Sequence, residues 1–270
     1  MEQTADNNGN SRINGRMEEI KQYWFVIREL TGREIKRKYA RSYLGILWSV
    51  LSPLLFMLVM SLLFSTMFKR SIEHFPLYFL IGHLVWDMHG QVSRSIMTVL
   101  VDNKSLLLRT KVPKNVFILS RCYTGFVNCL FSLVPLFPLM LIFRVAPSWK
   151  FLLFPIGIIF GMLFSLGLGY ILAVLYVFFA DIKYLYGVVL TLWMYMSALF
   201  YPIDRVPPAV QMVIYNNPVY DYAEFCRDCM LYGRIPEMGI WLRVILWGIS
   251  SYLFGYLVFR TKENEIMKNL

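Results

Sequence analysis

The sequence predicts an all-α, polytopic membrane protein with six transmembrane helices. Its 270 residues are 57% hydrophobic, with a mean hydropathy of +0.52, whereas soluble domains are about 45–50% apolar. An uncharged run from Ser42 to Phe68 exceeds the roughly 20 apolar residues that cross a bilayer. A basic cluster precedes this run, and Lys and Arg beside a span mark its cytoplasmic end. We therefore expect the N-terminus inside and the first span leading outward.

The N-terminal region divides into two parts. Residues 1–16 are polar and rich in Asn and Gly, a composition that predicts a disordered cytoplasmic tail. Residues 17–41 form an amphipathic interface helix and the basic junction, with apolar residues near helical spacing at Ile20, Tyr23, Trp24, Ile27 and Leu30. Such a helix lies on the cytoplasmic membrane surface or against a partner protein, and both readings are compatible.

The transmembrane domain is expected over residues 42–259, followed by a cytoplasmic tail at 260–270. Six apolar segments are its spans: Ile46–Phe68, Phe75–Met97, Val116–Phe143, Phe151–Phe179, Tyr184–Tyr201 and Ile240–Phe259. With six spans, the inside segments hold 17 Lys and Arg residues and the outside segments hold 7. Both termini are then cytoplasmic, as the positive-inside rule favours.

The second span is unusual because it contains His83, Asp87, His89 and Arg94. Omitting it would place the basic loop 102–115 outside, so six spans is the better prediction. His83 and Asp87 share one helical face, and ionisable groups within a span suggest a proton relay. The alternative is structural: Asp87 pairs with Arg94 or with Arg121.

Small residues recur every four positions along the fourth span, at Gly157, Gly161, Ser165 and Gly169. Such a stripe lets two helices approach closely, either within one subunit or between two.

Residues 202–237 are too polar to cross the bilayer and too apolar for a free loop. The pattern predicts two short outer-leaflet helices between spans five and six, separated by Asn217-Pro218. A plain external hairpin is the alternative.

Composition also limits the partners. The net charge of +10 reflects basic residues at span ends, so we expect anionic lipid and no nucleic acid. Cys226 and Cys229 form a lone CxxC, which cannot complete a four-ligand zinc site, and no metal site is expected. The sequence contains no Gly-x-x-x-x-Gly-Lys-Ser/Thr phosphate loop, so ATP would have to be bound by another polypeptide.

Three patches together resemble the permease subunits of ABC-type polysaccharide exporters, the Wzm/TagG-like group that exports O-antigen, capsule and teichoic-acid glycans. They are Arg33-Glu34-Ile35-Lys36-Arg37-Lys38-Tyr39 with Ser42-Tyr43-Leu44-Gly45, Trp48 and Pro53; Asn103–Leu108 with Lys111-Val112-Pro113; and Ser197–Ile203 with Val206-Pro207 and Asn217-Pro218. Each patch is weak by itself, but their order and position relative to the spans fit the group from about Met17 to the C-terminus.

The resemblance implies a homodimer in the bacterial cytoplasmic membrane, bound to two ATPase subunits that hold ATP and Mg. A glycan linked to undecaprenyl pyrophosphate would pass outward between the two permeases. The resemblance also implies that the surface helix and the loop after span two contact the ATPase.

Four sets of candidate residues follow. The ATPase-coupling set is Asp102, Asn103, Lys104, Leu106, Leu107, Lys111 and Pro113, with an apolar edge at Leu106 and Leu107; a solvated basic loop is the alternative. The lipid-pyrophosphate set at the cytoplasmic entrance is Arg33, Lys36, Arg37, Lys38 and Arg41. The alternative is that these residues only set the membrane topology and hold anionic lipid. The channel aromatic set is Tyr43, Trp48, Phe56, Trp86, Trp193, Tyr195, Phe200 and Tyr201. The alternative is that these side chains fill the protein core or belong to an interfacial belt. The outer-gate set is Pro202, Pro207, Asn217 and Pro218.

No catalytic residue is expected, and the leading prediction is a non-catalytic export permease. Two other functions stay open: a proton-coupled secondary transporter that uses His83 and Asp87, and a membrane enzyme acting on lipid-linked sugars. No inverted repeat supports the former, and no paired acid and base groups support the latter.

Overall fold

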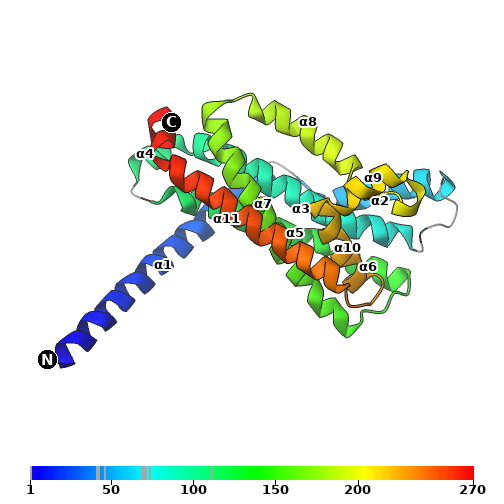
Figure 1. Ribbon diagram of the computed structural model, residues 1–270, viewed down its shortest axis with the longest axis horizontal. Helices are drawn as coiled ribbons and strands as arrows, with labels where there is room; N and C mark the ends of the chain where they lie inside the picture. Colours follow the sequence, from blue (N-terminus) through cyan, green and yellow to red (C-terminus); the bar gives the residue numbers. More distant parts are fainter. Residues whose placement is uncertain (1, 41–42, 46, 68–71, 73, 111) are drawn as a thin grey trace.

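The computed structural model describes residues 2–40, 43–45, 47–67, 72, 74–110 and 112–270. Within these ranges every regular element is a helix (Figure 1), which confirms the all-α prediction. By length and composition, four helical stretches could cross a membrane. They are Leu47–Phe64, Lys114–Ile142, Trp149–Phe178 and Met238–Asn269, and they correspond to the predicted spans one, three, four and six.

The helices expected as spans two and five are not among these four. α3 (Phe75–Asp102) is long enough, but its polar residues lower its hydropathy. α8 (Ile182–Tyr195) has 14 residues, about 21 Å at 1.5 Å per residue, and stops six residues before the predicted end at Tyr201.

The first helix, α1 (Glu2–Tyr39), begins within the segment expected to be disordered. Its N-terminal part extends away from the rest of the molecule (Figure 1). Once a helix has nucleated on packed residues, each further residue adds one hydrogen bond, and this lets α1 continue into polar sequence. Its C-terminal half packs against α5 (Lys114–Leu133): Ile27 and Thr31 are buried, and the ring of Trp24 lies 5.1 Å from that of Tyr123.

The centre of the fold is α3. It packs against α2 (Leu47–Met67), α5, α7 (Phe154–Phe178) and α10 (Pro218–Met230). Leu77, Val92 and Ile96 are fully buried in it. Four helices pack against α3, so most of its polar residues are buried or half-buried, while Arg94 is exposed. Protein contacts of this kind let a helix carry polar groups at membrane depth.

The small-residue stripe on α7 packs within the subunit. Gly157 and Gly161 face α10, and Gly169 faces Ile96 of α3. Ser165 is fully buried and hydrogen bonds His89, with 2.8 Å between Oγ and Nδ1. The stripe therefore packs against helices of its own chain, which is one of the two alternatives that the sequence left open.

A second glycine contact joins α7 to α11 (Met238–Asn269). A Cβ atom built on Gly255 would lie 2.0 Å from the carbonyl oxygen of Gly167. The two backbones therefore touch at this crossing, as small residues allow in membrane helices.

The remaining helices are short. α6 (Leu136–Ile142) continues α5 after a break at Val134-Pro135, η1 (Trp149–Leu153) precedes α7, and α4 (Lys104–Arg109) follows α3. The two short helices predicted within residues 202–237 are present as α9 (Pro208–Tyr215) and α10, after the single turn η2 (Ile203–Arg205).

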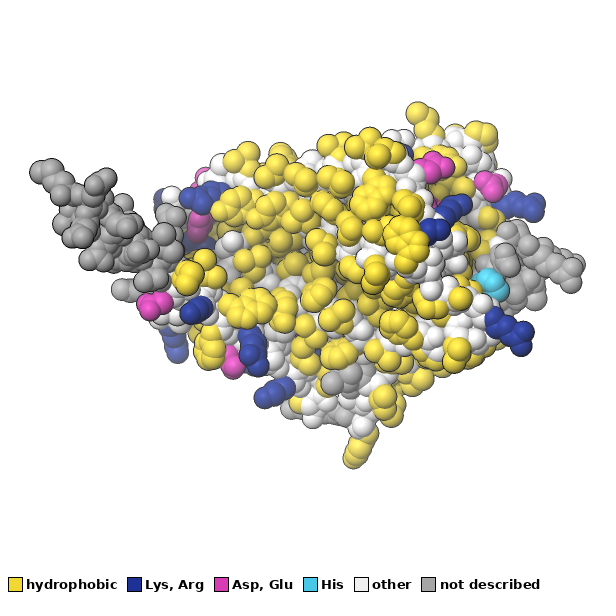
Figure 2. All heavy atoms as spheres, turned by 90° about the horizontal axis from the view of Figure 1, so that it is seen from below, with side chains coloured by type: hydrophobic (Ala, Val, Ile, Leu, Met, Phe, Trp, Pro, Cys, Tyr) yellow, Lys and Arg dark blue, Asp and Glu magenta, His cyan; other side chains and the backbone are white. Residues whose placement is uncertain are grey.

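The surface agrees with a membrane protein. Figure 2 shows hydrophobic side chains over the middle of one face, with basic and acidic side chains gathered toward the two ends. On α2 alone, Leu55, Leu58 and Leu62 are each at least half exposed. An apolar belt between two charged ends is what a bilayer requires.

Candidate functional site

The end of α1 is fixed to the body of the protein by a polar network. Arg33 donates from Nη2 to Asn103 Oδ1 at 3.3 Å, and Glu34 forms an ion pair with Arg121 of α5. Thr31 Oγ1 donates to the carbonyl oxygen of Ser120 at 3.2 Å. We call α4 and the parts of α1, α3 and α5 that these contacts join the docking module.

Most of the predicted ATPase-coupling residues belong to this module. Asp102 ends α3, with a carboxylate oxygen 3.9 Å from Arg121 Nη2. Asn103 is buried and bridges the turn, because its Nδ2 also donates to the carbonyl oxygen of Val99 at 2.8 Å. Lys104 and Pro113 are exposed, and Lys111 lies outside the described residues.

The apolar edge expected at Leu106 and Leu107 is divided. Leu107 turns inward and is 5% exposed, Leu106 is half-buried, and Leu108 is 56% exposed. Three successive helical residues point about 100° apart, so they cannot share one face. Leu108 is the apolar side chain that α4 exposes on the surface, and Leu107 packs into the core and fixes the helix there.

The predicted pyrophosphate residues divide in a similar way. Arg33 is held by Asn103, and Arg37 lies 3.5 Å from Glu34. Lys36 is exposed, Lys38 places Nζ 5.3 Å from the centroid of the Tyr39 ring, and Arg41 lies outside the described residues.

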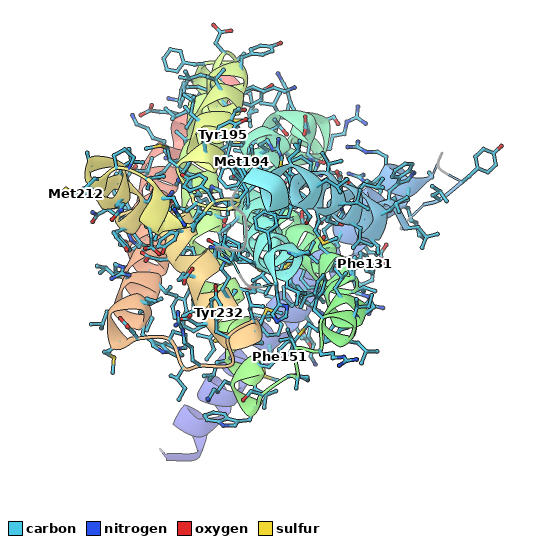
Figure 3. All side chains as sticks on the ribbon, turned by 90° about the vertical axis from the view of Figure 1, so that its right-hand side faces the viewer. Phe131, Phe151, Met194, Tyr195, Met212 and Tyr232 are labelled. Carbon is cyan, nitrogen blue, oxygen red and sulfur yellow. The ribbon has the colours of Figure 1, made fainter. Side chains whose placement is uncertain are left out.

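The predicted channel aromatics do not form one surface in a single copy of the chain. Trp86 and Phe200 are buried, Phe56, Trp193 and Tyr201 are half-buried, and Tyr43, Trp48 and Tyr195 are exposed. In Figure 3, Tyr195 marks the end of α8, and Met212 of α9 is 71% exposed at the edge of the molecule.

In the predicted outer gate, Asn217 joins three segments. Its Oδ1 accepts from Trp193 Nε1 at 2.8 Å and from the backbone amide of Val219 at 3.0 Å. Its Nδ2 donates to the carbonyl oxygen of Met196 at 2.8 Å and to Ser197 Oγ at 2.9 Å. The same side chain thus caps α10 and holds the end of α8. Pro218 is buried beside it, Pro202 is half-buried and Pro207 is exposed.

Arg227 of α10 is a site residue that the sequence reasoning missed, because it was counted with the basic residues of the outer side. It is fully buried. It donates from Nε to the carbonyl oxygen of Tyr78, and from Nη2 to those of Ala198 and Leu199, each at 3.3 Å. Its Nη1 lies 3.4 Å from Glu224 Oε2. The acidic residue three positions earlier, Glu224, which can pair with Arg227 on one helical face, was the available signal.

These contacts explain how the chain between α8 and η2 is stabilised without helical hydrogen bonds. Ala198 has φ +44°, a left-handed conformation that non-glycine residues rarely adopt. The carbonyl oxygens that this turn leaves free accept from Arg227 and Asn217, and Tyr78 Oη donates to Ala198 at 3.2 Å. Buried backbone groups need such partners.

Two more acidic residues of α10 are held by arginines. Asp221 Oδ1 accepts from Arg243 Nε at 2.9 Å, and Asp228 Oδ1 accepts from Arg234 Nε at 2.6 Å. Burial raises the pKa of each carboxyl group to about 6, and the paired guanidinium groups oppose this shift.

Neither pairing expected for Asp87 is found among the described residues. Asp87 Oδ2 instead accepts from Gln91 Nε2 at 2.6 Å. Arg94 donates to the carbonyl oxygen of Gly90, and Arg121 pairs with Glu34. Arg94 and Arg121 are satisfied by nearer acceptors, so this part of the sequence prediction is wrong.

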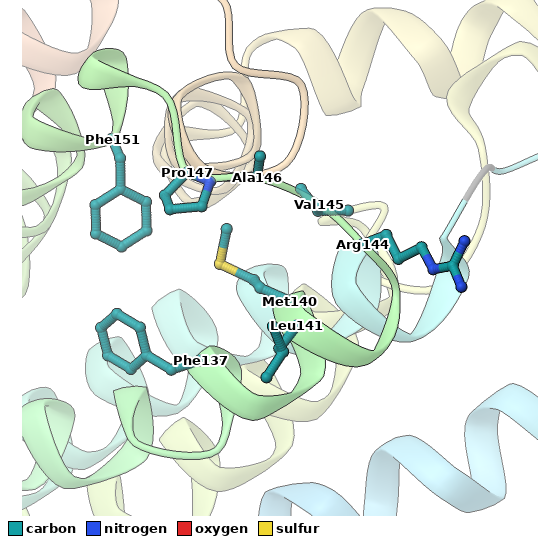
Figure 4. Close-up of a pocket in the computed structure, with 8 residues that line it drawn as sticks. All are labelled: Phe137, Met140, Leu141, Arg144, Val145, Ala146, Pro147 and Phe151. Atoms are coloured by element: carbon teal, nitrogen blue, oxygen red, sulfur yellow. The ribbon is translucent and has the colours of Figure 1, made fainter.

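An apolar groove of about 600 Å³ lies between α6 and the segment that leads to η1 (Figure 4). Phe137, Met140 and Phe151 form its floor and side, and Arg144 lies at one end. Its lining is typical of a surface that faces lipid.

Comparison with known proteins identifies the family. The family model described as "ABC-2 type transporter" matches residues 26–231. The chain is 29% identical over 264 residues to the O-antigen export system permease protein RfbA of Myxococcus xanthus, covering 93% of this chain and 98% of that protein.

Two more distant relatives are also named as polysaccharide export or transport proteins. The chain is 23% identical to an O-antigen export system permease protein RfbA of Klebsiella pneumoniae and 22% identical to the polysialic acid transport protein KpsM of Escherichia coli. Each match covers 87% of this chain and 92% of the relative. The matched range includes the docking module and the buried α10, so the chain belongs to the ABC-2 type transporter family of membrane permeases.

Proposed function

We propose that the chain is the membrane-spanning subunit of an ATP-driven exporter in the bacterial cytoplasmic membrane. Its cargo is a polysaccharide linked to undecaprenyl pyrophosphate. Two copies form the channel, and two separate ATPase subunits bind ATP and Mg. The names of the relatives support this cargo class, since they cover O-antigen and polysialic acid.

The docking module is the observation that carries the proposal. Its network ties α1 to the turn between α3 and α4, so a force applied to α4 reaches α3, the centre of the core. The exposed side of α4 combines an apolar contact, Leu108, with the basic residues Lys104 and Arg109. Such a mixed surface suits a groove on a partner protein.

Six spans are part of the proposal. α3 crosses the membrane because other helices cover most of its polar side chains, Arg94 excepted, and α8 crosses with the turn that follows it. Irregular backbone at membrane depth is tolerated only where protein satisfies it, and Arg227 and Asn217 do so here. Both termini are then cytoplasmic, and α9 and α10 lie in the outer leaflet as the outer gate.

The exposed position of Tyr195 supports a homodimer. Tyr195 is exposed at the end of α8, and α8 contacts little of its own chain. A symmetric pair of such surfaces would enclose a pathway that six helices cannot enclose by themselves.

Deletion of the chain tests the function directly. We expect surface polysaccharide to disappear and lipid-linked polymer to accumulate inside the cell. Leu108→Asp should reduce export and the co-purification of an ATP-hydrolysing protein, because a charge replaces the apolar contact. Thr261→Asp, also exposed, is the matched control. Unchanged surface polysaccharide in the deletion strain would refute the proposal.

A further inference from the structure

The last turns of α11 pack against the rest of the protein. The predicted sixth span ends at Phe259, but α11 continues without a break to Asn269 and has 32 residues. A helix that only crosses the bilayer needs about 20 residues. Ile266, in the extension, is fully buried and belongs to the main hydrophobic core. The extension is therefore a structural element of the protein and has a fixed place beside the other helices.

Glu263 of this extension holds the first residue of α5. Lys114 Nζ donates to Glu263 Oε1 at 3.0 Å, and the Lys114 side chain is 16% exposed. Lys114 begins α5 after the short segment that leads from α4. The two residues are 149 positions apart in the sequence, so only the packing of the helices brings them together.

A second contact holds the same end of α5 to α7. Tyr170 Oη donates to Asn115 Oδ1. Tyr170 is fully buried, and its ring centroid lies 5.2 Å from that of Phe259 on α11. The start of α5 is thus held through two adjacent residues, by α11 at Lys114 and by α7 at Asn115.

The opposite end of α11 holds the candidate outer gate. Arg243 Nε donates to Asp221 Oδ1 of α10 at 2.9 Å, and Tyr222 Oη of α10 donates to the carbonyl oxygen of Val244 at 3.1 Å. Figure 1 shows α11 extending from the end of the molecule where α10 lies to the end where α4 lies. One helix therefore contacts both the outer gate and the helix that follows the coupling residues.

The length and continuity of α11 suit it to connect these two ends. Arg243 and Glu263 are 20 residues apart, which is about 30 Å along an α-helix and matches the roughly 30 Å hydrocarbon core. Residues 238–269 contain no proline, a common cause of sharp kinks. Between the two ends, the contact of Gly167 with Gly255 fixes α11 to α7. A displacement of the start of α5 can therefore reach α10 through one continuous helix.

We infer that Glu263 is a positioning residue for transport. It holds the ATPase-coupling region to α11, and α11 transmits the movement of that region to the outer gate. The inference rests on the proposed export function, which supplies the ATPase and the cargo. The connection is separate from the contacts that join α1 to α3 and α5.

Charge exchange tests the inference in cells that produce the full chain together with its ATPase subunit. Glu263→Lys places two ammonium groups beside each other. We expect surface polysaccharide to fall at least about fivefold, the lower end of the range for coupling between two sites. The amount of co-purified ATPase and its rate of ATP hydrolysis should stay close to the parent values, because the exposed side of α4 is unchanged. Adding Lys114→Glu restores the ion pair with reversed charges and should recover most of the lost export.

Glu265→Lys is the matched control, because it makes the same change of charge on the same extension. The Glu265 side chain is 50% exposed and pairs with Lys262 at 2.9 Å. Its replacement should leave export unchanged. The melting temperature of E263K should stay within about 4 °C of the parent value, since a partly exposed ion pair contributes little to stability.

Four outcomes would overturn the inference: normal export in E263K; equal losses of export in E263K and E265K; a loss that the added K114E does not restore; or a fall in co-purified ATPase or in folded chain that accounts for the loss of export. Each of these leaves the deletion test unaffected. Unchanged surface polysaccharide in the deletion strain would instead refute the proposed function itself.

Discussion

The guanidinium group of Arg227 lies over the ring of Tyr78, with its central carbon 3.5 Å from the ring centroid. A buried cation needs hydrogen bonds or an aromatic face to offset its desolvation, and Arg227 has both. The contact joins α10 to α3, and the hydrogen bonds of the same side chain extend to the turn after α8. One residue therefore connects the candidate outer gate to the core.

Replacing Arg227 by Met should lower the free energy of unfolding by about 3 kcal/mol, because three hydrogen bonds to buried carbonyl groups are lost. Arg227→Lys should recover only part of this, since an ammonium group cannot reproduce the planar fork. Thermal unfolding of the purified chain measures the loss. Arg205→Met, on the exposed η2 turn, is the control, and equal melting temperatures for R227M and R205M would contradict this assignment.

Asn217 offers a graded test of the gate. Asn217→Asp keeps an oxygen for Trp193 and Val219 but loses the donor to Met196 and Ser197. Asn217→Leu loses all four bonds. We expect N217D to lower the free energy of unfolding by about 1–2 kcal/mol and N217L to lower it more, by loss of buried hydrogen bonds.

The control for this series is Asn216→Leu, since Asn216 is exposed and makes one hydrogen bond to the carbonyl of Met212. Its melting temperature should stay close to that of the parent chain. If N216L and N217L are equally destabilising, the hydrogen bonds of Asn217 do not hold the gate.

Gly255→Ala should separate α7 from α11, because the new methyl group would lie 2.0 Å from backbone that cannot move aside easily. A loss of several kcal/mol is expected, as overpacking against backbone is severe. Gly187→Ala is the matched control: no atom lies within 4 Å of the added Cβ. That variant should be neutral or more stable by up to about 1 kcal/mol, through helix propensity. Similar stabilities for both variants would mean that the crossing is not tight.

The acidic residues of α10 predict a pH dependence. Their folded-state pKa of about 6 lies above the ordinary value of 3.8. Between pH 4 and 6 the folded state thus binds more protons than the unfolded state, and the contribution of these groups to stability decreases as pH rises through that window. Melting temperatures measured from pH 4 to 7 should show a flatter profile in Asp221→Asn. Asp204→Asn, on exposed η2, should keep the parent profile, and a steeper profile in D221N would reverse the sign argued here.

The ion pair of the docking module predicts a coupling energy. A double-mutant cycle with Glu34→Gln and Arg121→Gln should give about 1–3 kcal/mol, because Arg121 has only 10% of its side chain exposed. The cycle for Lys262 and Glu265, which are about half exposed, should give at most about 0.5 kcal/mol. Equal values in the two cycles would show that the module is not fixed by this pair.

Many of the helices can be predicted from the local sequence. Apolar runs predict helices long enough to cross a membrane. The break at Pro135 follows from the missing backbone N–H of proline, and the two short helices after residue 202 follow from the need to satisfy backbone groups at membrane depth. The interior of the candidate site does not follow in this way. Arg227 reads as one more basic residue, and Leu107 and Leu108 read alike, because sequence spacing does not tell which face of a short helix meets the core.

The sequence by itself determined that this protein is a helical membrane protein with a basic cluster before its first apolar run, because hydropathy and charge act locally along the chain, and its three motif patches pointed to the permease family. Only the tertiary structure decided which polar groups meet. The contacts of Arg227 with Tyr78, of Glu34 with Arg121 and of His89 with Ser165 join residues 76 to 149 positions apart. Such contacts depend on how the helices pack, and packing is settled by the whole core at once.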